Sequence, residues 1–449
     1  MRATLIVTVV LLLSLPATAQ AQGGTADPRL ERAAALISND RLQEADAQLA
    51  AVLKSRPDDA LALNLLGTVR AKQGRLDEAE ALFVRALRAD RDFAGAHMNL
   101  AYLYLLKGAP EKTVAELREV HRLVPEDADT SYKLAHLLLT LGRLDECVAF
   151  VNTERQSNRL TPPLLAFLGD AYLKKGDVGR AEESYRAALE AQGDNADALL
   201  GLALVSQSKG DAQSASLYLS RVRPLTTNSP ELLYRFAVAA LRSNQFEDAK
   251  SALEEAVRLS PEEPSYFVAL GAVWLKKPDI FEAERQFRQA LRLRPDNAPA
   301  QMYLGYTLLK QKKLPEAREW LEKSARADAN SPETFYYLGL IAQEQNEDAR
   351  AVELFSNAVR LLPAYADARI ALGSVYLKLK DYARARQELE AGAKLKPDDS
   401  KAHYNLARLY ALLKDQQRAQ AEMAIVERLK NSGKAQTQEG DIGAPSSPR

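Results

Sequence analysis

The side chains best suited to chemistry are few and scattered through this chain. Four histidines, His97, His121, His136 and His403, lie near no cysteine or paired carboxylates with the spacing of metal ligands. Cys147 is the single cysteine, so it cannot form an internal disulfide. The chain has no GxSxG, no HExxH and no glycine-rich phosphate loop. These patterns predict no metal, no cofactor and no catalytic residues, so the chemistry to look for is binding.

Small residues recur with a fixed period. Glycine falls every 34 residues from Gly74 to Gly210, and the same frame, counted from Ala26, gives twelve units without insertion that end at Ser432 or Gly433. The units begin at residues 26, 60, 94, 128, 162, 196, 230, 264, 298, 332, 366 and 400. Such a period indicates an array of one small repeated unit, which leaves almost nothing for a separate catalytic domain.

Each unit is expected to be an antiparallel pair of helices. The eighth position is always glycine or alanine and the twentieth is alanine in ten of twelve units, so two helices can cross closely there. Glycine at the fifteenth position, replaced by Asn244 and Asn346 in two units, supplies a left-handed residue that ends the first helix. Acidic pairs such as Asp77-Glu78 favour the start of the second helix. Proline at the thirty-second position, as in Pro295, ends it.

This pattern resembles the tetratricopeptide repeat family. The segment Tyr266 to Pro295 carries the small-residue, aromatic and proline positions of that family in order, and the resemblance covers residues 26–433. It implies an all-α fold, a right-handed α-solenoid superhelix of about twelve helix-turn-helix repeats. The members of the family bind partners along the inner groove of the superhelix, which typically holds an extended peptide or a helix of the partner.

The fourth and sixth units depart most from the repeated pattern. In the fourth, Cys147 replaces the usual alanine, where we expect a buried core thiol, and Glu154 stands at a position that is usually small. In the sixth, Thr227 stands where proline is common. The junction between Asn152 and Pro163 is therefore the first place to look for a hinge.

The overall charge gives no reason to expect a nucleic-acid or anionic membrane partner. Sixty basic residues balance sixty acidic ones, so no global field gathers phosphate groups. The basic clusters Lys276-Lys277 and Lys310 to Lys313 are interpreted as solvated ends of helices.

The first residues of the chain predict export. Arg2 is followed by the apolar run Leu5 to Leu15 and the small residues Ala17-Thr18-Ala19, the pattern of a secretory signal peptide over residues 1–19, with cleavage after Ala19 or after Ala21. The apolar run is shorter than the ~20 residues of a membrane span. No cysteine follows it, so a lipoprotein anchor is not expected; the alternative is an uncleaved anchor. We expect an exported protein without a transmembrane segment, in the periplasm or outside the cell.

The other end of the chain has a different composition. Residues 434–449, above all Gln436 to Arg449, are rich in glycine, proline, serine and other polar residues without helical periodicity. Such a composition predicts a disordered tail. No extra helix is expected after Lys430, so either the last unit is its own cap or a partner covers it.

The binding surface follows from helix geometry. On the first helix of each unit, positions 2, 6, 9 and 13 point away from the helix crossing, toward the groove that the resemblance implies. Tyr303, Tyr306, Tyr336 and Tyr337 form the strongest local group, because tyrosines are favoured anchors for partners; the alternative is that they only fill a narrow groove. The candidate partner-binding residues are Asn99, Tyr102, Lys133, His136, Asp170, Arg235, Tyr303, Tyr306, Tyr336, Tyr337, Asn405 and Arg408.

These observations favour an exported, non-catalytic scaffold that binds protein or extended peptide partners. A second hypothesis is a component of an envelope machine that exports polysaccharide or assembles pili or outer-membrane proteins. A third, an enzyme with a hidden site, is weakened by the lack of room for a second domain. A clamp for the C-terminal carboxylates of a chaperone, which some members of the family use, is not expected, because Asn99, Lys401 and Asn405 supply only part of its pattern.

Overall fold

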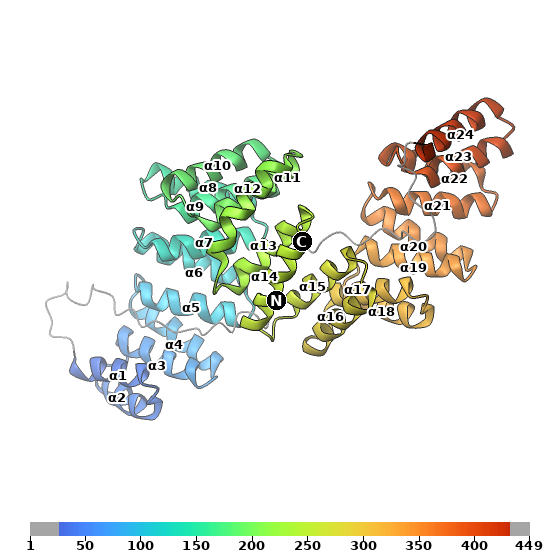
Figure 1. Cartoon of the computed structure of the whole chain (residues 1–449). Coiled ribbons are helices and arrows are strands. Elements are labelled where there is room, and N and C mark those ends of the chain that lie inside the picture. Colours follow the sequence, from blue (N-terminus) through green and yellow to red (C-terminus); the bar gives the residue numbers. More distant parts are fainter. Residues whose placement is uncertain (1–26, 432–449) are drawn as a thin grey trace. The chain divides into compact units, whose positions relative to one another are not determined.

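The structure, a computed structural model, describes residues 27–431, and all regular structure in that range is helical. The expected signal peptide and the expected tail beyond Asn431 lie outside the described residues. The chain divides into two compact units between Tyr218 and Leu219, within α12, Ala212–Val222. Each unit is a row of helical pairs (Figure 1). The prediction of an all-α solenoid is confirmed.

In the first unit, each pair packs against the next, as α1 with α2, α2 with α3 and α1 with α3. The helices before α12 are α1 Pro28–Ser38, α2 Leu42–Ser55, α3 Ala60–Lys72, α4 Leu76–Ala89, α5 Ala94–Leu106, α6 Pro110–Leu123, α7 Ala128–Thr140, α8 Leu144–Gln156, α9 Pro162–Lys174, α10 Val178–Ala191 and α11 Ala196–Ser208.

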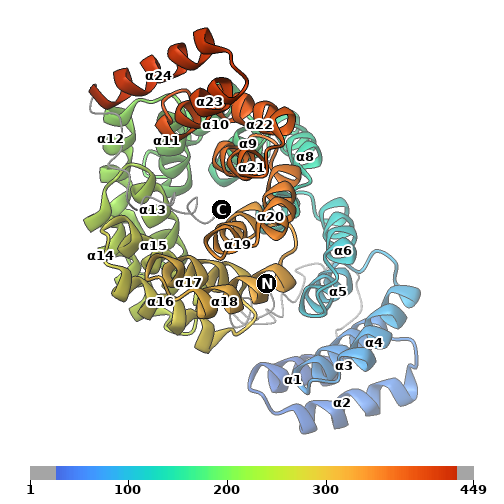
Figure 2. The ribbon, with the colours of Figure 1, turned by 90° about the vertical axis from the view of Figure 1, so that its right-hand side faces the viewer.

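The second unit repeats the same packing. After the short 3-10 helix η2, Arg223–Thr226, the helices are α13 Pro230–Arg242, α14 Phe246–Leu259, α15 Pro264–Lys276, α16 Ile280–Leu293, α17 Ala298–Lys310, α18 Leu314–Ala327, α19 Pro332–Glu344, α20 Asp348–Leu361, α21 Ala366–Lys378, α22 Tyr382–Leu395, α23 Ser400–Leu412 and α24 Gln416–Asn431. In this unit α15, α17, α19 and α21 follow one another along one side of the row (Figure 2).

The helix ends fall where the repeated residues place them. Gly74 and its equivalents up to Gly210 have positive φ, as do Asn244 and Asn346, so these predictions are confirmed. Lys312, with φ of 60°, holds the same place in a later repeat, although lysine gives no signal for a left-handed conformation. The second helices end two residues before the repeated prolines, as α16 does before Pro295.

The small residues at the helix crossings are required by space. A Cβ atom on Gly271 would lie 2.4 Å from Cε1 of Phe287, and one on Gly169 would lie 2.5 Å from Cε1 of Tyr185. Ala283, at the crossing of α15 and α16, is completely buried. The second helix of these repeats therefore packs a large aromatic side chain against the glycine of the first helix. This contact explains why a small residue on the first helix and a large one on the second recur together in the sequence.

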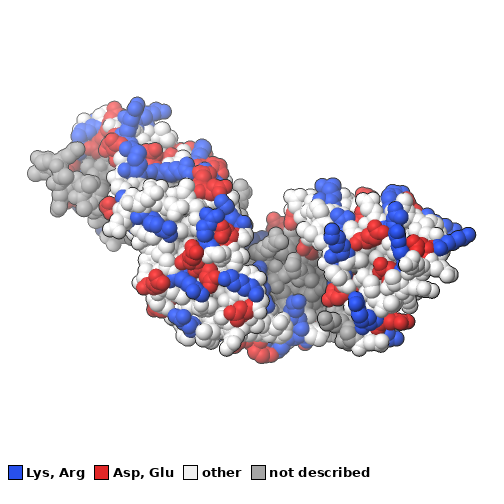
Figure 3. All heavy atoms as spheres, turned by 90° about the horizontal axis from the view of Figure 1, so that it is seen from above, with Lys and Arg blue, Asp and Glu red and all other residues white. Residues whose placement is uncertain are grey.

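Surface charges are largely paired along the array. Lys107 Nζ lies 2.7 Å from Asp77 Oδ1 in the preceding repeat, and Lys378 Nζ lies 2.7 Å from Asp348 Oδ1. Lysines and arginines alternate with acidic residues on the face seen in Figure 3. Lys312, in the basic cluster after α17, lies 2.9 Å from Glu344. Exposed pairs of this kind stabilise a fold little, so their main consequence is a surface of mixed charge.

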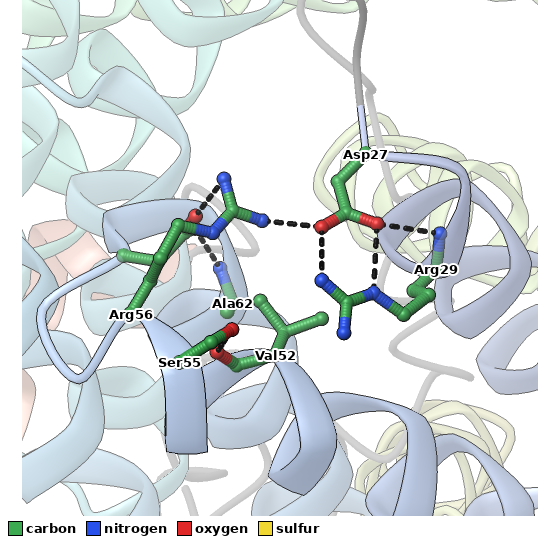
Figure 4. A network of polar contacts seen from close by, with 7 residues as sticks. Asp27, Arg29, Val52, Ser55, Arg56 and Ala62 are labelled. Atoms are coloured by element: carbon green, nitrogen blue, oxygen red, sulfur yellow. Dashed lines mark hydrogen bonds and ion pairs between the residues drawn. The ribbon is translucent and has the colours of Figure 1, made fainter.

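A charged network holds the first repeat to the loop that follows it. Asp27 caps α1 and accepts hydrogen bonds from the backbone and side chain of Arg29, and Arg56 Nη2 lies 2.6 Å from the same carboxylate (Figure 4). The hydrogen bonds from Arg29 and the charge of Arg56 lower the pKa of Asp27 to about 2. The contact ties the first residue of the described chain to the loop between α2 and α3.

The fourth repeat contains a buried ion pair. Glu154 is completely buried, and its Oε1 lies 3.0 Å from Arg159 Nη2 and 3.2 Å from His121 Nε2. Ser131 Oγ donates a further hydrogen bond of 3.3 Å. Glu154 stands at a position that is usually small, and Arg159 stands where six repeats have proline. This network lies at the junction where a hinge is expected, and the hinge itself stays a prediction.

The thiol of Cys147 is buried, as expected. Its Sγ lies 3.7 Å from the carbonyl oxygen of Ala135, and burial raises the pKa of the thiol to about 11. A thiol that stays protonated at neutral pH is a poor nucleophile and a poor metal ligand.

Within residues 27–431, no helix combines the length and the hydropathy that crossing a membrane requires.

Candidate partner-binding face

The candidate residues of the first unit lie on what we call the odd-helix face, the side of the row formed by the odd-numbered helices. α1 packs on α3, α3 on α5, α7 on α9 and α9 on α11. Contacts between side chains on this face run from one odd-numbered helix to the next. The expected stripe, that is, positions 2, 6, 9 and 13 of the first helix of each repeat, therefore forms one continuous set of neighbouring residues in this unit.

An amide and hydroxyl group begins the set. Asn99 on α5 donates from Nδ2 to Asn64 Oδ1 on α3 over 2.9 Å and lies 3.5 Å from Thr68 Oγ1. Thr68 in turn donates to the backbone carbonyl of Asn64. Asn99 is half-buried, so its amide is held in a fixed orientation at the edge of the face.

A tyrosine and a lysine follow on the next two odd-numbered helices. Lys133 Nζ on α7 lies 5.7 Å from the ring centroid of Tyr102 on α5, close enough for a cation–π contact. Lys133 also pairs with Asp129 one turn earlier on α7. The lysine charge is thus compensated within the face.

An aromatic platform, defined as Tyr132, His136 and Phe167, continues the set on α7 and α9. The rings of Tyr132 and His136 are parallel within 5°, with centroids 6.1 Å apart. Phe167 lies beneath them, 5.0 Å from Tyr132 and 5.6 Å from His136. Phe167 is buried, whereas Tyr132 is 41% exposed and His136 is exposed as well. The platform therefore presents ring surface to solvent on a packed base.

Sequence reasoning named His136 but missed Tyr132 and Phe167. Phe167 occupies the sixth position, which belongs to the expected stripe, so its aromatic type was a usable signal. Tyr132 stands at the fifth position, one residue outside the stripe, and its exposure depends on how α7 packs on α9. Asp170, at the far end of the set, accepts a hydrogen bond of 2.6 Å from the hydroxyl of Tyr185 on α10.

The four tyrosines of the second unit are buried, so the expectation that they are exposed anchors is wrong. Tyr303 is 2% exposed and Tyr337 is 0% exposed, and Tyr306 and Tyr336 are buried too. Phe287 stacks on Tyr303 with centroids 5.2 Å apart. Helical geometry within one helix could not show that neighbouring helices cover these positions, as Phe287 on α16 covers Tyr303 and Phe355 on α20 lies beside Tyr336.

These tyrosines form a connected aromatic core. The ring of Tyr337 lies 4.9 Å from that of Tyr306 and 5.4 Å from that of Tyr336, and Tyr336 lies 5.1 Å from Tyr365. Burial raises the pKa values of Tyr303, Tyr336 and Tyr337. These rings therefore belong to the core between helices, and the alternative interpretation, that they only fill a narrow groove, is closer to this packing than that of exposed anchors.

The remaining candidates of the second unit are more accessible. Arg235 on α13 and Asn405 on α23 are half-buried. Arg408 is exposed, and its guanidinium carbon lies 5.9 Å from the ring centroid of Tyr404, an exposed residue on the same helix. Arg235 belongs to the repeat that begins at residue 230, whereas Asn405 and Arg408 both stand on α23 in the last repeat.

The histidines have structural neighbours rather than metal-binding ones. In the part of the chain that the structure describes, no three His, Cys, Asp or Glu side chains come together as a metal site would require. His97 Nδ1 lies 2.7 Å from Glu116 Oε2 and Nε2 lies 3.1 Å from the carbonyl of Arg91. His403 has the same arrangement with Glu422 and the carbonyl of Pro397.

Comparison with known families identifies the class of protein. Models of the tetratricopeptide repeat match residues 30–92, 66–119 and 340–409. The model of the C-terminal domain of cilia and flagella-associated protein 70 matches residues 147–336. Together with the regular array of helical pairs, these matches show that the chain is a tetratricopeptide repeat protein.

Two curated relatives are bacterial proteins with nearly the same name. The chain is 28% identical over 225 residues to cellulose synthase operon protein C of Xanthomonas axonopodis pv. citri, a match over 50% of this chain and 13% of that protein. It is 25% identical over 231 residues to cellulose synthase 1 operon protein C of Komagataeibacter xylinus, over 51% and 16% of the two chains. The match thus spans less than a fifth of each relative.

Among solved structures, the chain is similar to the crystal structure of the APC/C hetero-tetramer Cut9–Hcn1. The TM-score is 0.53 at 18% identity, and the match covers 90% of this chain and 80% of that one. At this level of identity the similarity concerns the fold alone.

Proposed function

We propose that this protein is an exported, non-catalytic scaffold that binds protein partners on the odd-helix face of its first unit. The observation that carries the proposal is the continuous row of side chains from Asn99 through Tyr102 and Lys133 to the aromatic platform. Exposed aromatic rings on a packed base resemble the anchors on which interfaces depend. Solenoids of this kind are typical binding surfaces, since each repeat adds area to an extended face.

We further propose that the partners belong to a machine that assembles or exports material at the bacterial envelope. The support is the similarity to cellulose synthase operon protein C in two bacteria. Because the match covers a small part of those proteins, the proposal concerns a repeat region that holds other components together. It does not extend their whole activity to this chain.

Site-specific photo-crosslinking tests the proposed face. A photoreactive amino acid is placed at Tyr102 or at Tyr132 in the full chain, in cells that express it naturally. As a matched control, the same group replaces Arg186, an exposed residue on the even-numbered helix α10. We expect a discrete crosslinked partner from positions 102 and 132 and none from position 186. Crosslinks from position 186 alone would move the binding surface to the opposite side.

The proposed location has a separate test. Sequencing the N-terminus of the protein from an envelope fraction should give Gln20 or Gln22 as the first residue, because the small residues before each form a cleavage site. Recovery of intact Met1 in a cytoplasmic fraction would contradict export.

A further inference from the structure

We infer that the aromatic platform and Tyr102 bind a proline-rich segment of the partner in the polyproline II conformation. The inference rests on the proposed function, because it specifies the chemistry of the partner for the same face. Proline rings pack well on aromatic side chains, and a polyproline II helix is ordered before it binds. Tyr132 and His136 offer two parallel rings at the surface, on the base that Phe167 provides.

A segment that crosses the face from α5 to α7 meets both aromatic groups. Tyr102 stands on α5, and Tyr132 and His136 stand on α7, the next odd-numbered helix. Lys133 on α7 links them, because its Nζ lies 5.7 Å from the ring centroid of Tyr102.

The polar groups of the face match a ligand that mainly accepts hydrogen bonds. Proline lacks a backbone N–H, and a polyproline II helix leaves its carbonyl groups exposed. Along the row, the ammonium group of Lys133 carries three donors and pairs with Asp129, whereas the amide of Asn99 donates to Asn64 and lies 3.5 Å from Thr68 Oγ1. The carboxylate of Asp170 accepts from Tyr185.

Charge favours the same class of partner. Lys133 is paired with Asp129, so the centre of the row has no strong field to select an acidic or a basic peptide. A neutral polysaccharide would also tolerate this surface and could stack on the rings. A binding comparison with a cello-oligosaccharide distinguishes the two ligands.

Binding of a labelled oligoproline to the purified full chain tests the inference. The probe is a fluorescent peptide of about nine prolines, or three polyproline II turns, and fluorescence anisotropy measures its affinity. A glycine-serine peptide of equal length and a cello-oligosaccharide are the comparison ligands. We expect the oligoproline to bind, and Tyr132→Ala to weaken it by roughly tenfold or more, as loss of an aromatic anchor does.

Three variants make the result specific. Tyr132→Phe keeps the ring and should retain the affinity, whereas His136→Ala, at an exposed position, should weaken it. Phe281→Ala removes a ring that is 76% exposed on α16 in the second unit and should have no effect. Circular dichroism of each variant checks that the helices are intact.

Other outcomes would overturn the inference. They are absence of oligoproline binding to the wild type, wild-type affinity in both the Tyr132→Ala and the His136→Ala variants, or binding of the cello-oligosaccharide in place of the peptide. If the oligoproline fails while photo-crosslinks from positions 102 and 132 persist, the proposed function stands and only the class of partner is wrong.

Discussion

The role of an aromatic side chain in this array depends on what covers it. Tyr132 and Tyr337 both lie on odd-numbered helices near the expected stripe, yet one is 41% exposed and the other is 0% exposed. Tyr337 has rings of Tyr306 and Tyr336 beside it, whereas Tyr132 lies over Phe167 and faces outward. The first stabilises the fold, and the second is available to a partner.

Replacement of Tyr337 should therefore affect stability. Tyr337→Ala should lower the free energy of unfolding by about 3–5 kcal/mol, as loss of a large buried ring does. Tyr337→Phe keeps the ring packing and should cost much less. Chemical denaturation followed by circular dichroism measures both variants. An unchanged midpoint for Tyr337→Ala would show that this ring does not contribute to the core.

His97 forms a pair of side-chain contacts, here called the clamp, with a carboxylate and a backbone carbonyl, and this pair recurs in other repeats. Its two ring nitrogens face the acceptors Glu116 and the carbonyl of Arg91, which only the doubly protonated ring can satisfy together. Arg369 makes the equivalent contacts with Glu388 and the carbonyl of Pro363, and Gln301 donates to the carbonyl of Pro295. The hydrogen bond with Glu116 raises the pKa of His97 above its usual value.

This clamp predicts a pH dependence. A raised pKa in the folded state means that His97 stabilises the fold fully below its ordinary pKa of about 6.5, and that this stabilisation is lost as the pH rises through the folded-state value. His97→Gln keeps a donor for the carbonyl without titrating. The difference in unfolding free energy between wild type and variant should shrink as the pH is raised from about 5 to about 9. A difference that stays constant would contradict the assignment.

At the scale of elements, the fourth repeat packs the end of its second helix differently from other repeats. In the eighth repeat, for example, the second helix carries Ala290 and is followed by Pro295, whereas the fourth repeat has Glu154 on α8, which contacts Arg159 and His121. A buried carboxylate is tolerated only with such partners, because an unpaired charge would lose its hydration. We therefore expect Glu154 and Arg159 to contribute to stability as a pair rather than independently.

A double-mutant cycle should reveal that coupling. Glu154→Ala alone removes the buried carboxylate that Arg159, His121 and Ser131 contact, and should destabilise the fold. Adding Arg159→Ala should cost less than the sum of the single changes, with a coupling energy of about 0.5–3 kcal/mol. Denaturation midpoints of the four proteins give the cycle. Additive costs would mean that the two residues act independently.

At the scale of the whole molecule, the period of the sequence carried most of the information about the fold. From residue 60, the helix pairs begin every 34 residues, because small residues, left-handed turns and prolines recur at fixed places. The exposure of Tyr303 or Tyr132 could not be predicted in this way. It depends on contacts between neighbouring repeats, and residues near the expected stripe are covered to different extents in different repeats.

The same one-dimensional packing sets how far a defect can spread. Ala283 is completely buried at the crossing of α15 and α16, so Ala283→Leu should cost about 1–3 kcal/mol through overpacking. Each repeat contacts only its neighbours, so the loss should remain near that crossing. Hydrogen exchange should accelerate in α13 to α18 and stay unchanged in α1 to α11. Faster exchange throughout the chain would show instead that the array unfolds as one cooperative body.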